Sequence, residues 1–285
     1  MARSSSHPAT ARSSMIRCYL SGNPVHDRVI KAFYEGCPEE KELVEGFIYK
    51  PADLAVVFGV YKSKVPVSWP RGEIFRRQRD NNKNVVVLET GYINRGDGLN
   101  HHYAAGLNGL NGRADFRNVG MPPDRFQKLQ VELKPYGEGD AVILCGQVPW
   151  DASVDHVDLV RWLHTVAEEI MWNTRRKLVF RPHPLATLPA PRGWELSTKP
   201  LAEDLKGAHC VVTFNSNSGV EALLSGVPVF AFDKGSMCWG VANKSLAEID
   251  LPRKPDREEW ANDLAYCQWT IDEMKNGETW RHLLR

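Results

Sequence analysis

The sequence has 285 residues, of which 42% are hydrophobic and 25% are charged, and its formal net charge is +1. A chain of this length and composition can bury its own core, which excludes a disordered protein and a small disulfide-stabilised scaffold. The near-neutral charge excludes a polycation that coats nucleic acid through its overall charge. No apolar run approaches the roughly 18 residues of a membrane-spanning helix, so no membrane insertion is expected.

The N-terminal segment and the cysteines indicate where the chain resides. Residues 1–14 are rich in Ser, Arg and Ala and lack an apolar segment, which predicts a disordered tail rather than a signal peptide. The six cysteines are scattered without a CxxC pair, and Cys145 and Cys210 lie inside apolar runs as buried thiols do. A reducing, cytoplasmic compartment is therefore expected.

Short apolar runs alternate with amphipathic stretches in the first half of the chain. Strands are predicted over residues 16–20, 53–59 and 84–89, and helices over residues 26–35 and 70–82. Strands that alternate with helices are typical of a parallel sheet. Residues 91–140 are rich in Gly and Asn and have little periodic apolar pattern, which predicts a long functional loop.

A second alternation begins at Ala141. Strands are predicted over residues 141–146, 209–214 and 227–232, a strand that runs into a loop over 177–184, and helices over residues 155–172, 201–206 and 219–224. The expected fold class is therefore α/β, with two Rossmann-like lobes that face each other across a cleft. The expected divisions are a tail over residues 1–14, lobes over 15–140 and 141–255, and C-terminal helices over 256–285 that pack across both lobes.

Ligands of open α/β sheets bind outside the carboxyl ends of the strands, and a polar motif follows the apolar run 177–180. In Arg181-Pro182-His183-Pro184, two prolines fix the backbone, so a guanidinium and an imidazole are held in place. These groups could clamp a diphosphate. The alternative is a rigid loop that carries a surface Arg and a surface His.

A second motif follows the strand at 209–214. Residues 215–219 read Asn-Ser-Asn-Ser-Gly and begin a helix, whose N-terminus is a potential anion site. Asn217 and Ser218 could equally serve as N-caps. Glu221 in the first turn stabilises the helix and could also bond ribose hydroxyls.

Two further motifs follow the strands at 141–146 and 84–89. The polar residues of 146–153 could touch the substrate, or could simply end a strand and cap the next helix. Glu89 ends a buried strand that faces the predicted cleft, which makes it a candidate general base. A lone Glu at a strand end is more often structural.

Together these four motifs resemble those of the capsule-polysaccharide glycosyltransferase family, whose members include Kdo transferases with a GT-B-like fold. The matching segments read Glu89–Tyr92 for E-x-G-Y/F, Gly146–Ser153 for G-Q-x-x-x-D-x-S, Arg181–Pro184 for K/R-P-H-P, and Asn215–Val229 for N-S-x-x-G-x-E-A-L-x-x-G-x-P-V. The resemblance covers roughly residues 53–232. One departure is that Ile93-Asn94-Arg95-Gly96 stands where the family usually has an Arg-Pro pair.

The resemblance implies a nucleotide-sugar donor, UDP- or CMP-linked, bound by the C-terminal lobe, and an acceptor bound by the N-terminal lobe. It implies that Glu89 is the catalytic carboxylate. Asp97 and Asp115 are the alternative candidates for this role. The residues expected to bind the donor are Gln147, Asp151, Ser153, Arg181, His183, Asn215, Ser216, Asn217, Ser218, Gly219 and Glu221. Those expected to bind the acceptor are Tyr92, His101, His102, Asn108, Asn111 and Arg113. No cofactor and no metal are expected, because GT-B-like enzymes neutralise the leaving diphosphate with a helix dipole and cationic side chains.

Three hypotheses for the acceptor and activity remain open at this point. The favoured acceptor is a hydroxymethylated pyrimidine flipped out of double-stranded DNA, because the compact chain with its basic stretch 71–83 resembles small phage enzymes, which act in the host cytoplasm. The first alternative is a surface polysaccharide or lipid-linked glycan, as in Kdo transfer. The second is a non-catalytic nucleotide-binding or epimerase-like protein.

Overall fold

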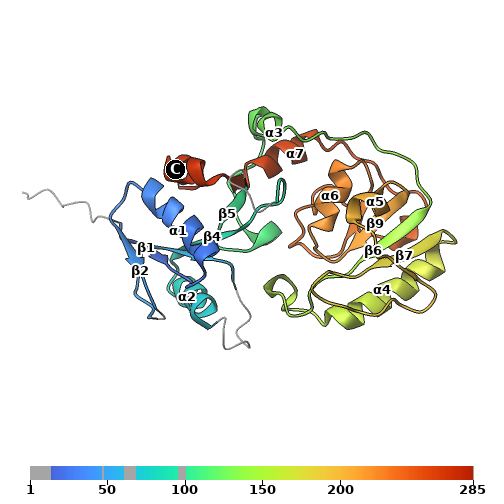
Figure 1. The fold of residues 1–285 in the computed structure, drawn as a ribbon, viewed down its shortest axis with the longest axis horizontal. Coiled ribbons are helices and arrows are strands. Elements are labelled where there is room, and N and C mark those ends of the chain that lie inside the picture. Colours follow the sequence, from blue (N-terminus) through green and yellow to red (C-terminus); the bar gives the residue numbers. More distant parts are fainter. Residues whose placement is uncertain (1–13, 47, 61–68, 96–100, 285) are drawn as a thin grey trace, which may run out of the picture.

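The computed structural model describes residues 14–46, 48–60, 69–95 and 101–284, and these residues form two lobes, each built on its own sheet (Figure 1). Most of the expected tail and Asp97 lie outside the described residues. The α/β fold class with two Rossmann-like lobes is confirmed.

The first sheet has six strands in the described part of the chain. They are β1 (Ile16–Tyr19), β2 (Lys41–Val44), β3 (Leu54–Phe58), β4 (Asn84–Thr90), β5 (Tyr103–Leu107) and β11 (Gln268–Trp269). Their order is β11-β5-β4-β3-β1-β2, and β1 to β4 are parallel. Because the chain order reverses beside β1, the strand ends there flank a crevice in which ligands of such sheets bind.

Two helices cover opposite faces of this sheet (Figure 1). The first, α1 (Pro24–Gly36), buries Ile30 and Phe33 against one face, and its N-terminus is capped by Asn23, whose side chain accepts two backbone hydrogen bonds. The second, α2 (Trp69–Asp80), buries Ile74 against the other face. Strand β3 and the middle of β4 are fully buried because both faces are covered, whereas the edge strand β2 is partly exposed.

The prediction of one long loop over residues 91–140 is wrong in part. Strand β5 lies inside this segment and pairs antiparallel with β4 and with β11. Its sequence, Tyr-Ala-Ala-Gly-Leu, has small residues instead of an apolar alternation, because a side chain at Gly106 would collide with the ring of Phe116. A 3₁₀ turn (Asn111–Arg113) and a short helix, α3 (Asp124–Lys128), follow.

The second sheet of the described chain has five parallel strands in the order β10-β9-β6-β7-β8. They are β6 (Ala141–Cys145), β7 (Lys177–Arg181), β8 (Glu195–Leu196), β9 (Ala208–Thr213) and β10 (Val229–Ala231). Helix α4 (Leu159–Asn173) covers one face, with Leu163 and Ile170 in the core, while α5 (Leu201–Leu205) and α6 (Ser218–Leu224) cover the other (Figure 1).

After the second sheet the chain returns to the first lobe (Figure 1). Helix α7 (Glu258–Ala265) packs against α3, and the helices α8 (Ile271–Lys275) and α9 (Glu278–Leu283) pack against α1. Arg125 of α3 is buried, pairs with Glu273 at 2.9 Å, and lies over the ring of Trp269. None of the helices among the described residues has the length and apolarity to cross a membrane.

Candidate active site between the two lobes

A cavity of about 520 Å³ lies between the lobes, where the carboxyl ends of strands from both sheets meet. The first lobe lines it with the end of β4 and with residues that follow β3, β4 and β5, and the second lobe with the loops that follow β6, β7, β9 and β10. The sequence-predicted residues that line it are Glu89, Tyr92, Asn111, Gln147, Asp151, Ser153, His183, Asn215, Ser216 and Asn217.

Glu89 is the carboxylate that the first lobe presents to this cavity. It is the penultimate residue of β4, and its side chain accepts a hydrogen bond of 2.8 Å from the backbone N–H of Thr90. Burial raises the pKa of Glu89, as does the charge of Asp151, while the Thr90 hydrogen bond and the Arg95 charge lower it less. A carboxylate with a raised pKa is a stronger base than an ordinary surface carboxylate, which favours the role of a general base.

The backbone beyond Glu89 is held by a buried side chain from the far end of the sequence. Gln268 of β11 accepts hydrogen bonds from the N–H groups of Tyr92 and Ile93 at 2.7 and 2.9 Å, and donates one to the carbonyl of Ile93. Gly91 must be glycine, because a Cβ there would lie 2.5 Å from the carbonyl oxygen of His102. These contacts fix the direction in which β4 delivers Glu89.

His183 is the imidazole that the second lobe presents to the cavity. Its Nδ1 accepts a hydrogen bond of 3.1 Å from the N–H of Leu185, so the neutral ring carries its proton on Nε2. Burial lowers the pKa of His183, which favours this neutral form. The ring can therefore donate a hydrogen bond to a phosphate oxygen from a fixed position.

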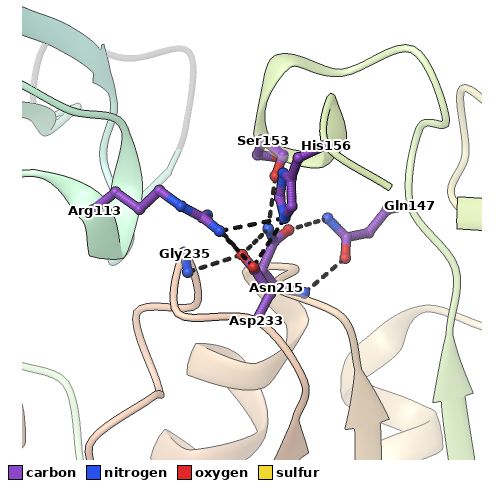
Figure 2. A network of polar contacts seen from close by, with 7 residues as sticks. All are labelled: Arg113, Gln147, Ser153, His156, Asn215, Asp233 and Gly235. Atoms are coloured by element: carbon purple, nitrogen blue, oxygen red, sulfur yellow. Dashed lines mark hydrogen bonds and ion pairs between the residues drawn. The ribbon is translucent and has the colours of Figure 1, made fainter. Parts of the chain in front are cut away.

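A polar network fixes the loops of the second lobe (Figure 2). Gln147 and Asn215 exchange two hydrogen bonds of 2.7 and 2.9 Å, and Asn215 also donates to the carbonyl of Ser153 and to the carboxylate of Asp233. Gln147, Asn215 and Asp233 are all buried. The side chains of Gln147 and Asn215 form their hydrogen bonds with groups of this network. They therefore shape the cavity wall more than they offer free hydrogen-bonding groups to a donor.

Arg113 of the first lobe reaches into this network. Its guanidinium makes two bonds to Asp233, of 2.7 and 2.5 Å, and Nε2 of His156 lies 3.0 Å from the same carboxylate (Figure 2). The backbone N–H of Gly112 donates to the carbonyl of Gly235 beside it. Arg113 does not line the cavity and instead joins the two lobes at its edge.

The loop before α6 differs from the anion site that the sequence suggests. The N–H groups of Gly219 and Val220 donate to the carbonyls of Ser216 and Asn217, and the N–H of Ser218 donates to the Ser216 hydroxyl. The first turn therefore satisfies its own donors. What this loop offers to the cavity are the side chains of Ser216 and Asn217.

Several predicted residues lie outside the cavity lining because protein groups bind them. The guanidinium of Arg181 pairs with Asp204 at 3.0 Å, and Asn108 bonds the backbone N–H of Val85 and the side chain of Asn84. Asp115 pairs with Arg117 on the surface. The other predicted residues that do not line the cavity are His101, His102, Arg113, Ser218, Gly219 and Glu221.

Three residues that shape the site have no role predicted from the sequence. Arg95 and Trp150 line the cavity, and Asp233 anchors its wall. Asp233 follows β10 closely, so the rule that selected polar residues at strand ends would have found it. Arg95 brings a positive charge to the first-lobe side of the cavity. It lies in the segment 93–96, where the resemblance leads one to expect an Arg-Pro pair. No group of three or more His, Cys, Asp and Glu side chains that could hold a metal ion occurs among the described residues.

Solved structures share this arrangement of two facing Rossmann-like lobes. The chain is similar to two solved structures of Thermosulfurimonas dismutans KpsC, a β-Kdo 2,4-transferase and a β-Kdo 2,7-transferase, each with a TM-score of 0.56 and 15% sequence identity. The first match covers 88% of this chain and 90% of that chain, and the second covers 94% and 98%. At this identity the likeness concerns the fold. A scan against protein-family models and a search of curated proteins give no match.

Proposed function

We propose that this chain is a nucleotide-sugar-dependent glycosyltransferase that adds a Kdo-type sugar to a glycan acceptor. The observation that carries the proposal is the largely buried carboxylate of Glu89, which lines the same interlobe cavity as the neutral imidazole of His183. The likeness to two Kdo transferases adds support as a fold-level analogy.

In the proposed reaction an acceptor hydroxyl oxygen bonds to the anomeric carbon of the donor sugar, while the bond from that carbon to the phosphate oxygen breaks. Glu89 takes the hydroxyl proton, and the electron pair of the broken bond leaves with the nucleotide phosphate. His183 Nε2–H, the Ser216 hydroxyl and the charge of Arg95 are the groups of the cavity that stabilise that phosphate.

A glycan acceptor fits better than the hydroxymethylated DNA base. The basic stretch that suggested DNA belongs to α2, where Arg76 and Arg77 both pair with Glu73, so part of its charge is neutralised within the helix. The two solved structures described above as similar to this chain are Kdo transferases. DNA is included in the test below as the alternative acceptor.

The test is a donor and acceptor panel with purified protein. CMP- and UDP-linked sugars are offered with a Kdo oligosaccharide, with DNA that contains hydroxymethylcytosine, and with no acceptor, and the products are read by mass spectrometry. The expected result is a sugar mass added to the oligosaccharide. In Glu89→Gln the rate of this transfer should fall by roughly 10²–10⁴-fold. Asp115→Asn is the matched control, because that carboxylate lies outside the cavity.

A sugar mass found only on the DNA would overturn the glycan assignment and keep the transferase. Nucleotide binding without any donor turnover would overturn the transferase itself and leave a non-catalytic nucleotide-binding protein.

A further inference from the structure

Trp150 is an aromatic side chain left in solvent at the cavity. It follows β6, lines the interlobe cavity, and is 61% exposed. An indole contributes a large apolar face, and leaving that face in water forgoes its burial free energy. An aromatic residue exposed beside a cleft is therefore a candidate contact for a ligand.

The loop that carries Trp150 is held by hydrogen bonds that connect it, through Ser153, to Asn215 of the polar network. The N–H of Asp151 donates to the carbonyl of Val148 at 3.1 Å, which closes a turn around the tryptophan. Asp151 in turn accepts hydrogen bonds from the N–H and the hydroxyl of Ser153 at 2.8 and 2.6 Å, and the carbonyl of Ser153 is held by Asn215. A ring on such a loop is presented to a ligand with little ordering cost.

The surroundings of the indole combine apolar and acidic groups. Val148 and Leu185, the latter 76% exposed, line the same cavity from two loops, and so does the Asp151 carboxylate. One face of a pyranose ring carries C–H groups that pack on an aromatic ring, while its hydroxyls donate to carboxylates. Both hydrogen bonds from Ser153 end on Oδ1 of Asp151, and Oδ2 can accept a further hydrogen bond from a sugar hydroxyl, so the mixed surface favours a sugar over a purely apolar ligand.

We propose that Trp150 is the platform on which a sugar residue of the acceptor glycan stacks, so that it determines specificity for the acceptor chain. The proposal rests on the proposed function. The donor must place its anomeric carbon at the largely buried Glu89, whereas a glycan chain has to leave the cavity into solvent, where the exposed Trp150 stands.

The test compares Trp150→Ala and Trp150→Phe with Trp172→Ala. Trp172 is the matched control, because it is 85% exposed on α4 and does not line the cavity. A Kdo disaccharide glycoside, CMP and UDP are titrated into each protein by calorimetry, and donor hydrolysis without acceptor is measured alongside.

The expected result is that Trp150→Ala weakens disaccharide binding by about tenfold and Trp150→Phe weakens it less. Nucleotide affinity and donor hydrolysis stay unchanged, and Trp172→Ala behaves as the wild type. Unchanged disaccharide affinity in Trp150→Ala overturns the platform, and so does a wild-type protein that binds no disaccharide. If Trp150→Ala instead loses affinity for CMP or UDP by a comparable factor, Trp150 contacts the donor, and this result also overturns the platform.

The two proposals fail in different measurements. If the wild type hydrolyses and transfers the donor while Trp150→Ala binds the disaccharide normally, only the platform is wrong. If the wild type turns over no donor, the proposed function is wrong, whatever the titrations show.

Discussion

Arg113 and Asp233 are 120 residues apart in the sequence and form a two-bond ion pair that joins the lobes at the edge of the cavity. Asp233 is nearly inaccessible, with 7% of its side chain exposed, whereas 42% of the Arg113 side chain is exposed. The pair therefore anchors a buried carboxylate of one lobe with a cation of the other, and it links the two lobes at this point.

Replacing Arg113 by Ala should destabilise the protein, because the Asp233 carboxylate then loses two charged hydrogen bonds. We expect a loss of about 1–2 kcal/mol in the free energy of unfolding, reduced from the value of a fully buried pair because Arg113 is partly solvated. Urea denaturation measures it. The control is Arg117→Ala, whose pair with Asp115 is more than half exposed on both sides and should change stability by less than about 0.5 kcal/mol. Equal effects of the two variants would mean that the lobe contact carries no special stability.

The same pair sets a dependence of stability on acid. Burial alone would raise the pKa of Asp233, but the hydrogen bonds from Arg113, Asn215 and Gly235 outweigh it and lower the pKa to about 2 from its usual 3.8. A depressed folded-state pKa stabilises the protein above the unfolded value, and that stability is lost as the pH falls from about 4 to about 2. Urea midpoints at pH 5 and pH 2.5 should therefore differ less in Asp233→Asn than in the wild type. Parallel losses in both proteins would show that other groups control the acid response.

Glu89 should act in the opposite sense on stability. Because burial raises the pKa of Glu89, the folded state binds its proton more tightly than the unfolded state does. This group therefore reduces stability as the pH rises from its unfolded pKa of 4.5 to its higher folded pKa. Glu89→Gln should raise the free energy of unfolding by about 0.5–2 kcal/mol at pH 8 while it abolishes transfer. Thermal unfolding at pH 8 and pH 4 measures the gain, which should vanish at the lower pH. The exposed Glu221→Gln should show no gain at either pH, and a Glu89→Gln protein less stable than the wild type at pH 8 would contradict the argument.

Gln268 should be needed both for folding and for the placement of Glu89. Gln268→Leu would leave two backbone N–H groups and one carbonyl around Tyr92 and Ile93 without their buried partner. We expect a loss of about 3 kcal/mol or more, measured by urea denaturation, and a lower kcat in the fraction that folds. Gln127→Leu on the exposed surface of α3 is the control. Normal stability in Gln268→Leu would mean that water replaces the lost partner.

The predicted residues whose place in the cavity could be expected are those whose position follows from a single strand. Glu89 and His183 lie at or just beyond the carboxyl ends of β4 and β7, and the carboxyl ends of parallel strands face the ligand, so their place in the cavity could be predicted. Arg181 occupies a similar position, yet its guanidinium turns to Asp204, a partner that no local pattern reveals.

The features that escaped the sequence depend on contacts between distant segments. Strand β5 carries small residues because Phe116 packs on Gly106, so its apolar alternation is absent and it resembled a loop. The contact of Arg113 with Asp233 exists only because the two lobes face each other. Such a contact follows from the arrangement of whole sheets, which a single sequence does not specify residue by residue.

The position of β11 has a consequence for synthesis on the ribosome. The second sheet is contiguous in the chain, from β6 to β10, and can close as soon as that stretch emerges. The first sheet cannot, because its edge strand and the glutamine that holds Tyr92 arrive 176 residues after that tyrosine. During translation the second lobe is thus complete while β5 still offers an open edge, and this interval is when the nascent chain is most exposed to aggregation and most dependent on chaperones.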